Sequence, residues 1–99
     1  MQPFTKAVIE QIQSIPPGKV MTYGGVAAAA GSPRAARQVV RILHSMSAKY
    51  DLPWHRVVNA KGEIALRDDE SHFLQQALLE DEGVEVGIGG RIDLSVYGV

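Results

Sequence analysis

The sequence predicts a mainly α domain with a small β-hairpin, arranged as a winged helix-turn-helix. Three observations lead to this fold class. Apolar residues recur at helical spacing in the first half of the chain, and a helix-stop glycine is followed at once by a helix-start Ser-Pro pair at 31–33. A turn sequence at 59–62 then separates two apolar segments. The 99 residues are expected to form one domain, residues 1–99.

A first helix is predicted over residues 3–14. Pro3 suits an early helical position, and the sequence Pro16-Pro17-Gly18 ends the pattern. An apolar stripe runs along this segment at helical spacing, formed by Phe4, Val8 and Ile12. Lys19 to Met21 is expected to be a short extended piece.

A second helix is predicted from the N-cap Thr22 to about Ala30. Gly31 is expected to end it in the left-handed conformation that a glycine C-cap adopts. In a third helix, Ser32 would be the N-cap and Pro33 would occupy the first helical position.

The third helix is predicted to run to about Ser45. Its inward stripe would be Ala36, Val39, Val40 and Leu43, with Ile42 at the edge. Three arginines would share another face, namely Arg34, Arg37 and Arg41. Two helices joined by a short glycine-containing turn form a helix-turn-helix, and the later helix is the one that faces DNA.

The second half of the chain is predicted to hold a wing and one more helix. Residues 46–53 would form a loop, and 57–58 would pair with 63–66 as a hairpin around the turn 59–62. A last helix is expected over 70–82, and residues 92–99 would form a short terminal segment. The inward side of the last helix would carry Phe73, Leu74, Ala77 and Leu78.

Charge is distributed unevenly, although the formal net charge is only −1. Residues 33–56 are basic and residues 63–85 are acidic, which suggests a molecule with two faces. The chain contains no cysteine, so disulfides, thiolate metal sites and a cysteine nucleophile are excluded. No metal and no cofactor is expected, because no set of His, Asp and Glu has metal-ligand spacing. No segment resembles a membrane span or a signal peptide, so a cytoplasmic protein is expected.

The start of the third helix is slim, because Ala35 and Ala36 stand beside Arg37. The minor groove of DNA is only ~6 Å wide, so a helix can enter it only where the duplex bends and the groove opens. An arginine at the tip of such a helix could fill the gap left by an extruded base. From spacing alone, a solvated arginine face explains the pattern equally well.

The string Pro53-Trp54-His55-Arg56-Val57 resembles the active-site motif Pro-Cys-His-Arg-Val of the O6-alkylguanine-DNA alkyltransferases. Tryptophan stands where that family has its cysteine, which is the hallmark of the alkyltransferase-like proteins. Val20-Met21-Thr22-Tyr23 and Ser32-Pro33-Arg34-Ala35-Ala36-Arg37 also resemble family segments, as does the helix end 78–83. These pieces follow one another in family order across most of residues 4–86.

The resemblance implies roles for particular residues. Tyr23 would press on the phosphate backbone, and Arg37 would replace the base that is rotated out. The base pocket would be formed by Tyr23, Trp54, Val57 and Arg67. The wider DNA contact would comprise Thr22, Tyr23, Ser32, Pro33, Arg34, Ala35, Ala36, Arg37 and Arg56.

The resemblance also implies binding without alkyl transfer. Transfer needs a nucleophile that keeps the alkyl group, whereas an indole offers only an N–H donor. We therefore expect a non-enzymatic protein, with His55 and Glu82 in structural roles. The expected partner is double-stranded DNA with O6-alkylguanine, bound by a monomer that marks the lesion for nucleotide excision repair proteins.

Three other readings of the same residues stay open at this point. A winged-helix transcription regulator would read a specific sequence with the same arginines. A glycosylase or lyase would need Lys19 or Lys61 as its nucleophile, and neither lysine has a telling acid or base beside it. The third is a protein-interaction module. Two departures from the alkyltransferase pattern affect the pocket loop, namely Met46 in place of a hinge asparagine and Asp68-Asp69 in place of a glycine-rich stretch.

Overall fold

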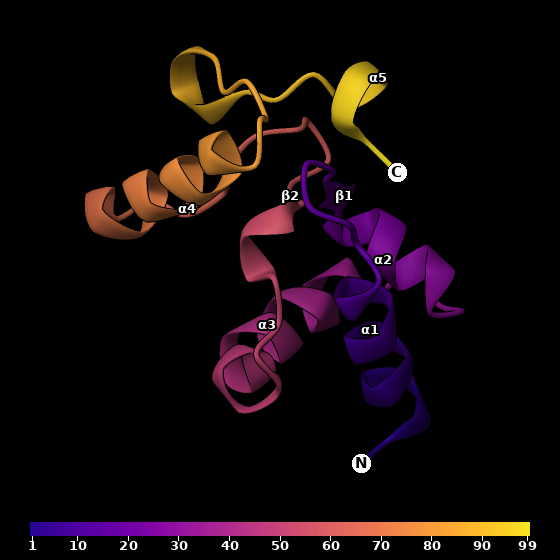
Figure 1. Ribbon diagram of the computed structural model, residues 1–99. Coiled ribbons are helices and arrows are strands. Elements are labelled where there is room, and N and C mark those ends of the chain that lie inside the picture. Colours follow the sequence, from indigo (N-terminus) through magenta and orange to yellow (C-terminus); the bar gives the residue numbers. More distant parts are fainter.

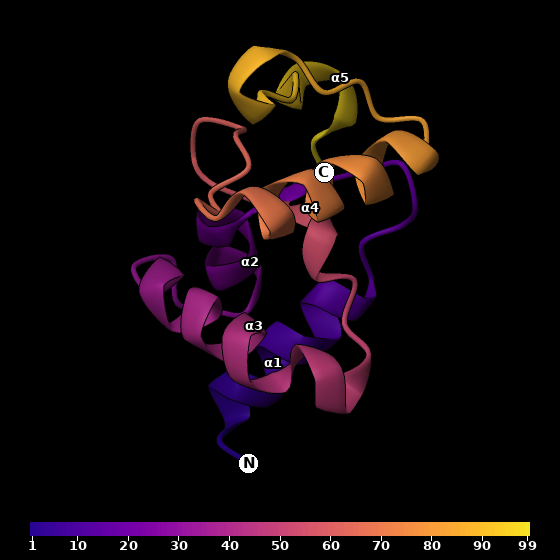
Figure 2. The ribbon, with the colours of Figure 1, turned by 90° about the vertical axis from the view of Figure 1, so that its left-hand side faces the viewer.

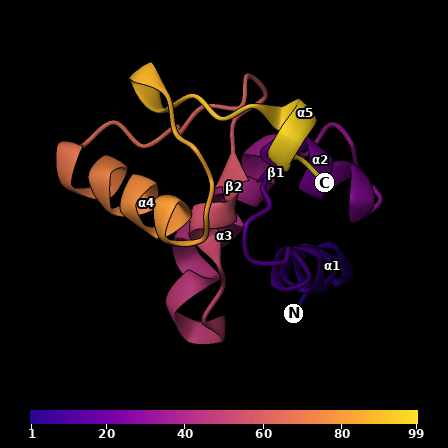
Figure 3. The same ribbon diagram turned by 45° about the horizontal axis from the view of Figure 1, so that its top comes forward.

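The computed structural model describes all of residues 1–99 and is mainly helical, which confirms the predicted fold class. Its elements are α1 (Pro3–Gln13), β1 (Met21–Thr22), α2 (Tyr23–Ala29), α3 (Ala36–Tyr50), η1 (Trp54–Arg56), β2 (Val57–Val58), α4 (Asp69–Asp81), η2 (Ile88–Gly90) and α5 (Leu94–Tyr97). The two strands lie at the centre, with α4 on one side and α1 and α2 on the other (Figures 1 and 3). The longest helix has 15 residues, and none combines the length and apolarity needed to span a bilayer.

The apolar core is divided into two clusters that meet at the small sheet. One cluster joins α1, α2 and α3 and includes Val57, and the other joins α4 to the C-terminal segment and includes Val58. Successive residues of a strand point to opposite sides, so adjacent valines supply both clusters. The strand β2 therefore links the helix-turn-helix half of the molecule to the half that carries α4.

The first two helices form as predicted. Val8 and Ile12 are buried on the predicted stripe of α1, and Phe4 packs against the same cluster. Thr22 is the N-cap of α2, where its Oγ1 accepts a hydrogen bond from the Gly25 N–H at 2.9 Å. Gly31 has φ +97°, which confirms the predicted left-handed end of this helix.

The third helix lies further along the chain than predicted. Residues 32–35 form a turn, in which the Ala35 N–H donates to the Ser32 carbonyl at 3.0 Å, and α3 begins only at Ala36. No breaker follows Ser45, so the helix continues through the predicted loop to Tyr50. It ends at Asp51, which has φ +50° in the left-handed region.

The inward faces of α3 and α4 also differ from the prediction. On α3, Ile42 is buried and Val40 is exposed. On α4, Phe73 and Leu74 are 64% and 51% exposed, while Gln75 and Leu79 are buried one turn apart. Hydrogen bonds made by the Gln75 amide fix this rotation of α4, and apolar periodicity alone gives no sign of them.

The predicted hairpin is wrong, because β2 pairs in parallel with β1. The turn 59–62 is present, but residues 63–66 form no strand with β2. Instead, the Ile64 N–H donates to the Gly90 carbonyl at 3.0 Å and the Ile92 N–H donates to the Gly62 carbonyl at 2.8 Å. Ile64 and Ile92 are both buried in the α4 cluster, and their packing draws this segment away from β2.

Candidate nucleic-acid interface

The start of α3 is exposed, basic and free of acidic residues. Arg37 and Arg41 are exposed on the helix, and Arg34 is exposed in the turn that precedes it. The first turn of α3 contains no acidic residue, and Ala35 provides no side-chain cap. The first N–H groups of a helix carry a partial positive charge, so this end favours an anion such as a phosphate.

Tyr23, the first residue of α2, lines the same cavity as Val40 and Leu43 of α3. Figure 2 shows α2 next to α3. Burial raises the pKa of the Tyr23 hydroxyl above 10.0, so the group stays neutral and can donate a hydrogen bond. Ser32 is half-buried in the turn, whereas Pro33 is exposed beside Arg34.

An open cavity of about 330 Å³ lies behind this helix-turn-helix face. Ligand pockets in proteins start at roughly this size. Its wall is mainly apolar, with a few hydrogen-bonding groups, and consists of Tyr23, Val40, Leu43, His44, Ser47, Trp54, Val57, Leu66, Ser71 and Gln75. Such a wall suits a flat heterocycle with an apolar substituent.

Trp54 lines the cavity and packs against the edge of the core. Its side chain is half-buried, and it begins the short helix η1 directly after Pro53. The indole meets the His55 ring edge to face, with the ring centroids 6.2 Å apart at an interplanar angle of 86°. One side of the indole is therefore held by the protein, while the cavity side remains available to a ligand.

Gln75 lines the cavity, and the sequence interpretation did not identify it. Its side chain is only 2% exposed, and its Nε2 donates to the carbonyls of His55 at 3.0 Å and Val57 at 3.1 Å. These bonds attach α4 to the segment that carries Trp54. The available signal was its spacing from Leu79, since residues four apart share a helix face.

Glu82 forms a closed network beneath the Trp54 segment. Its carboxylate accepts from the His55 Nε2 at 2.9 Å, from the Arg56 Nη2 at 2.6 Å and from the Gly18 N–H at 3.0 Å. Mainly because of Arg56, the pKa of Glu82 falls to about 2. The structural roles expected for His55 and Glu82 are confirmed by these contacts.

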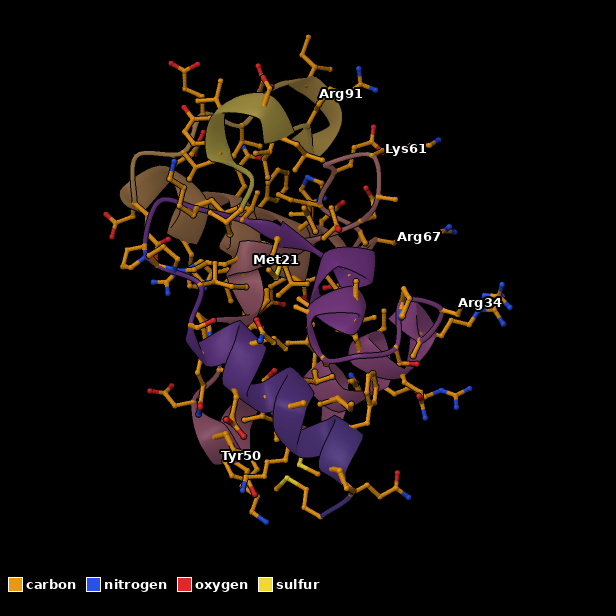
Figure 4. The ribbon with its side chains drawn as sticks, turned by 90° about the vertical axis from the view of Figure 1, so that its right-hand side faces the viewer. Met21, Arg34, Tyr50, Lys61, Arg67 and Arg91 are labelled. Atoms are coloured by element: carbon orange, nitrogen blue, oxygen red, sulfur yellow. The ribbon has the colours of Figure 1, made fainter.

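Two of the residues assigned to the interface from the sequence lie elsewhere. Arg56 is a correction: its side chain is 15% exposed, pairs with Glu82 and also donates to the Ile15 carbonyl at 2.8 Å. A guanidinium that is satisfied inside the protein is unavailable to a phosphate. Arg67 is also a correction, since it is absent from the cavity wall and points outward into solvent (Figure 4). The adjacent Leu66 contacts the cavity in its place.

The fold and the site together define a DNA-binding domain: a helix-turn-helix with a basic, uncapped second helix, placed beside a cavity that can hold a base. The particular family follows from the sequence. Residues 3–84 match the family described as 6-O-methylguanine DNA methyltransferase, DNA binding domain, and the chain belongs to this family.

Known relatives share most of this chain. It is 49% identical over 94 residues to a DNA base-flipping protein of Escherichia coli K12, covering 95% of this chain and 72% of the relative. It is 40% identical over 87 residues to Alkyltransferase-like protein 1 of Schizosaccharomyces pombe, covering 87% and 81% of the two chains. The structure of S. pombe Atl1 in complex with damaged DNA containing O6-carboxymethylguanine is similar with a TM-score of 0.88 at 36% identity, covering 100% of this chain and 96% of that one.

Proposed function

We propose that this protein binds duplex DNA containing O6-alkylguanine, turns the damaged base out of the helix and holds it without removing the alkyl group. The observation that carries the proposal is the cavity beside the middle of α3, which Tyr23 and Trp54 both line in a chain that has no cysteine. The names of its relatives support the same conclusion.

Opening of the duplex would depend on the N-terminal ends of α2 and α3. The small side chains of Ala35 and Ala36 leave room for the start of α3 in a widened minor groove. Arg37 is exposed beside them and would replace the base in the stack, while Tyr23 would contact the backbone of the turned-out nucleotide. Base flipping costs a few kcal/mol in normal DNA and less where pairing is already damaged.

The cavity would then receive the alkylated guanine. Trp54 offers an aromatic surface to the purine, and Val57 and Leu43 provide apolar contacts. The hydroxyl oxygens of Ser47 and Ser71 in the same wall can accept hydrogen bonds from base edges, while the Ser47 hydroxyl itself donates to the Leu43 carbonyl. One methylene in an apolar pocket changes affinity by only ~1–3 kcal/mol, so several alkyl groups would be accepted.

No thiolate is available at this site to accept the alkyl group, because the chain has no cysteine. A transfer enzyme needs a nucleophile, and the Trp54 indole has only an N–H donor. His55, the adjacent base, directs its Nε2 to Glu82. The product would therefore be a long-lived complex of a protein monomer on bent DNA. We propose that nucleotide excision repair proteins recognise this complex.

The test is a paired titration of one duplex with and without O6-methylguanine, followed by mass analysis of both DNA and protein. We expect tighter binding to the damaged duplex and unchanged masses afterwards. Equal affinity for the two duplexes would favour a sequence-specific regulator instead. A methylated protein, a released base or a nicked strand would show that the protein is an enzyme.

A further inference from the structure

Four exposed cationic side chains lie along one edge of the molecule and come from three separate segments. Arg34 belongs to the turn before α3, Lys61 and Arg67 to residues 59–68, and Arg91 to the segment after η2. All four point outward on the same side in Figure 4, whereas Tyr50 lies at the opposite end. We call this set, Arg34, Arg67, Lys61 and Arg91, the basic edge.

Contacts of the backbone fix the part of the basic edge that carries Lys61 and Arg91. The Asn59 Oδ1 accepts from the N–H groups of Lys61 at 3.0 Å and Glu63 at 2.9 Å. Gly62 has φ +78°, and a Cβ there would lie 2.7 Å from the Ile92 carbonyl oxygen, so the turn packs directly on the segment that follows Arg91. Lys61 and Arg91 are therefore presented side by side by a rigid turn and not by a free loop.

Few direct ion pairs neutralise the basic edge. The one ion pair along it joins Arg91 to Glu63 at 3.4 Å, and the Arg91 side chain remains 68% exposed. Arg34, Lys61 and Arg67 form no salt bridge. An edge of this kind, continuous with the exposed start of α3, fits a polyanion better than an acidic side chain of a small partner.

We propose that the basic edge binds the phosphates of the DNA arm on one side of the lesion, beyond the part of the duplex that α3 contacts. The orientation of the arm rests on the function proposed above. The molecule is 36 Å long. One DNA strand advances ~3.4 Å per phosphate, so such an edge can follow at most about ten base pairs. Lys61 and Arg91 stand furthest from α3 and contact DNA only where this arm is present.

The experiment compares the wild type with the double variant Lys61→Ala, Arg91→Ala on lesion duplexes whose arms differ in length. Each duplex has about three base pairs on one side of the lesion and about twelve on the other, in both orientations. The matched control is Lys6→Ala, Lys49→Ala, which removes the same charge from exposed residues outside the edge. Thermal melting checks that each variant is folded.

We expect the double variant to lose about tenfold in affinity at 0.1 M salt on one of the two orientations and little on the other. The slope of log affinity against log salt should fall by about 2 on the sensitive duplex, as two phosphate contacts predict. Glu63→Gln frees Arg91 from its carboxylate and should therefore raise the affinity for the sensitive duplex. The ratio of damaged to undamaged binding should stay as in the wild type.

Wild-type affinity and slope in both orientations would overturn the proposal, and so would an equal loss in both orientations that the control variant reproduces. A failure of the proposed function is recognised separately, because the wild type would then show no preference for the lesion. In that case the salt slope on undamaged duplex still reports whether the basic edge binds phosphates.

Discussion

The two sides of the segment Trp54–Arg56 differ in how completely their polar groups are satisfied. Beneath it, the Glu82 carboxylate is enclosed by donors from His55, Arg56 and Gly18. On the other side, Trp54 faces an open cavity with a mainly apolar wall and with room for a ligand. One short 3₁₀ turn therefore separates an internal hydrogen-bond network from a cavity with space for a ligand.

This difference shows that the frame of the site and its reactive group are separable. The Glu82 network and the Gln75 amide hold the segment in place through its backbone and through the residues that follow Trp54. The residue at position 54 itself takes no part in those bonds. A change from a nucleophile to an aromatic residue at that position can thus alter the chemistry while the geometry of the pocket is kept.

Disrupting the Glu82 network should have the largest effect on stability. Arg56→Ala leaves the Glu82 carboxylate without its main partner and frees the Ile15 carbonyl, at a cost of about 3 kcal/mol in unfolding free energy. Urea denaturation measures this loss. Arg91→Ala, which removes a largely exposed ion pair, is the control and should cost less than about 0.5 kcal/mol. Equal losses for the two variants would contradict the contrast between the two sides.

At the start of α3, Arg37→Ala should weaken DNA binding without changing the stability of the protein. The side chain is exposed in the free protein, so its removal breaks no internal contact. An interface residue of this kind contributes about 2 kcal/mol, which corresponds to roughly a thirtyfold loss of affinity for lesion DNA. Arg41→Ala, one turn further along α3, should cost only a few fold in fluorescence titrations. Undiminished lesion binding by the Arg37 variant would show that Arg37 does not replace the turned-out base.

Gln75 connects the two sides, so its replacement should produce a smaller effect on both. Gln75→Leu leaves the part-buried carbonyl of His55 and the buried carbonyl of Val57 without this donor, which costs roughly 1–2 kcal/mol of stability. The affinity for lesion DNA should fall as well, because Trp54 loses part of its support. Gln76→Leu is the matched control, since its amide contacts only Glu80 at 3.4 Å on the surface. A stable Gln75 variant with normal affinity would show that the two carbonyls need no donor.

The sequence predicted α1, α2 and the fold class well, because these depend on local signals. The apolar stripe of α1, the cap at Thr22 and the left-handed Gly31 all act within a few residues. The pairing of β2 with β1 joins segments far apart in the chain, and no local pattern reports it. The turn-like spacing at 59–62 was real, but turn chemistry alone does not choose the partner strand.

The prediction of the site was correct where it depends on residue type. It was wrong where it depends on the direction in which a side chain points. Tyr23, Trp54 and Val57 all line the cavity. Arg56 was placed on the DNA side although its guanidinium lies in the Glu82 network. A charged side chain is usually solvated, so only the fold could show that a carboxylate from the end of α4 satisfies it.

The smallest effect that we expect comes from acid, because it titrates Glu82 without removing any atom. The pKa of this carboxyl is about 2 in the folded protein and 4.5 in an ordinary setting. The unfolded state therefore binds the proton more readily, so stability is full above pH 4.5 and falls as the pH decreases toward 2. Glu82→Gln cannot titrate and should lack this part of the decline, although Asp68 and Asp93, whose pKa values are also lowered, still contribute to it. Melting temperatures of the two proteins between pH 6 and pH 3 test the claim, and parallel curves would mean that the network does not depend on the charge of Glu82.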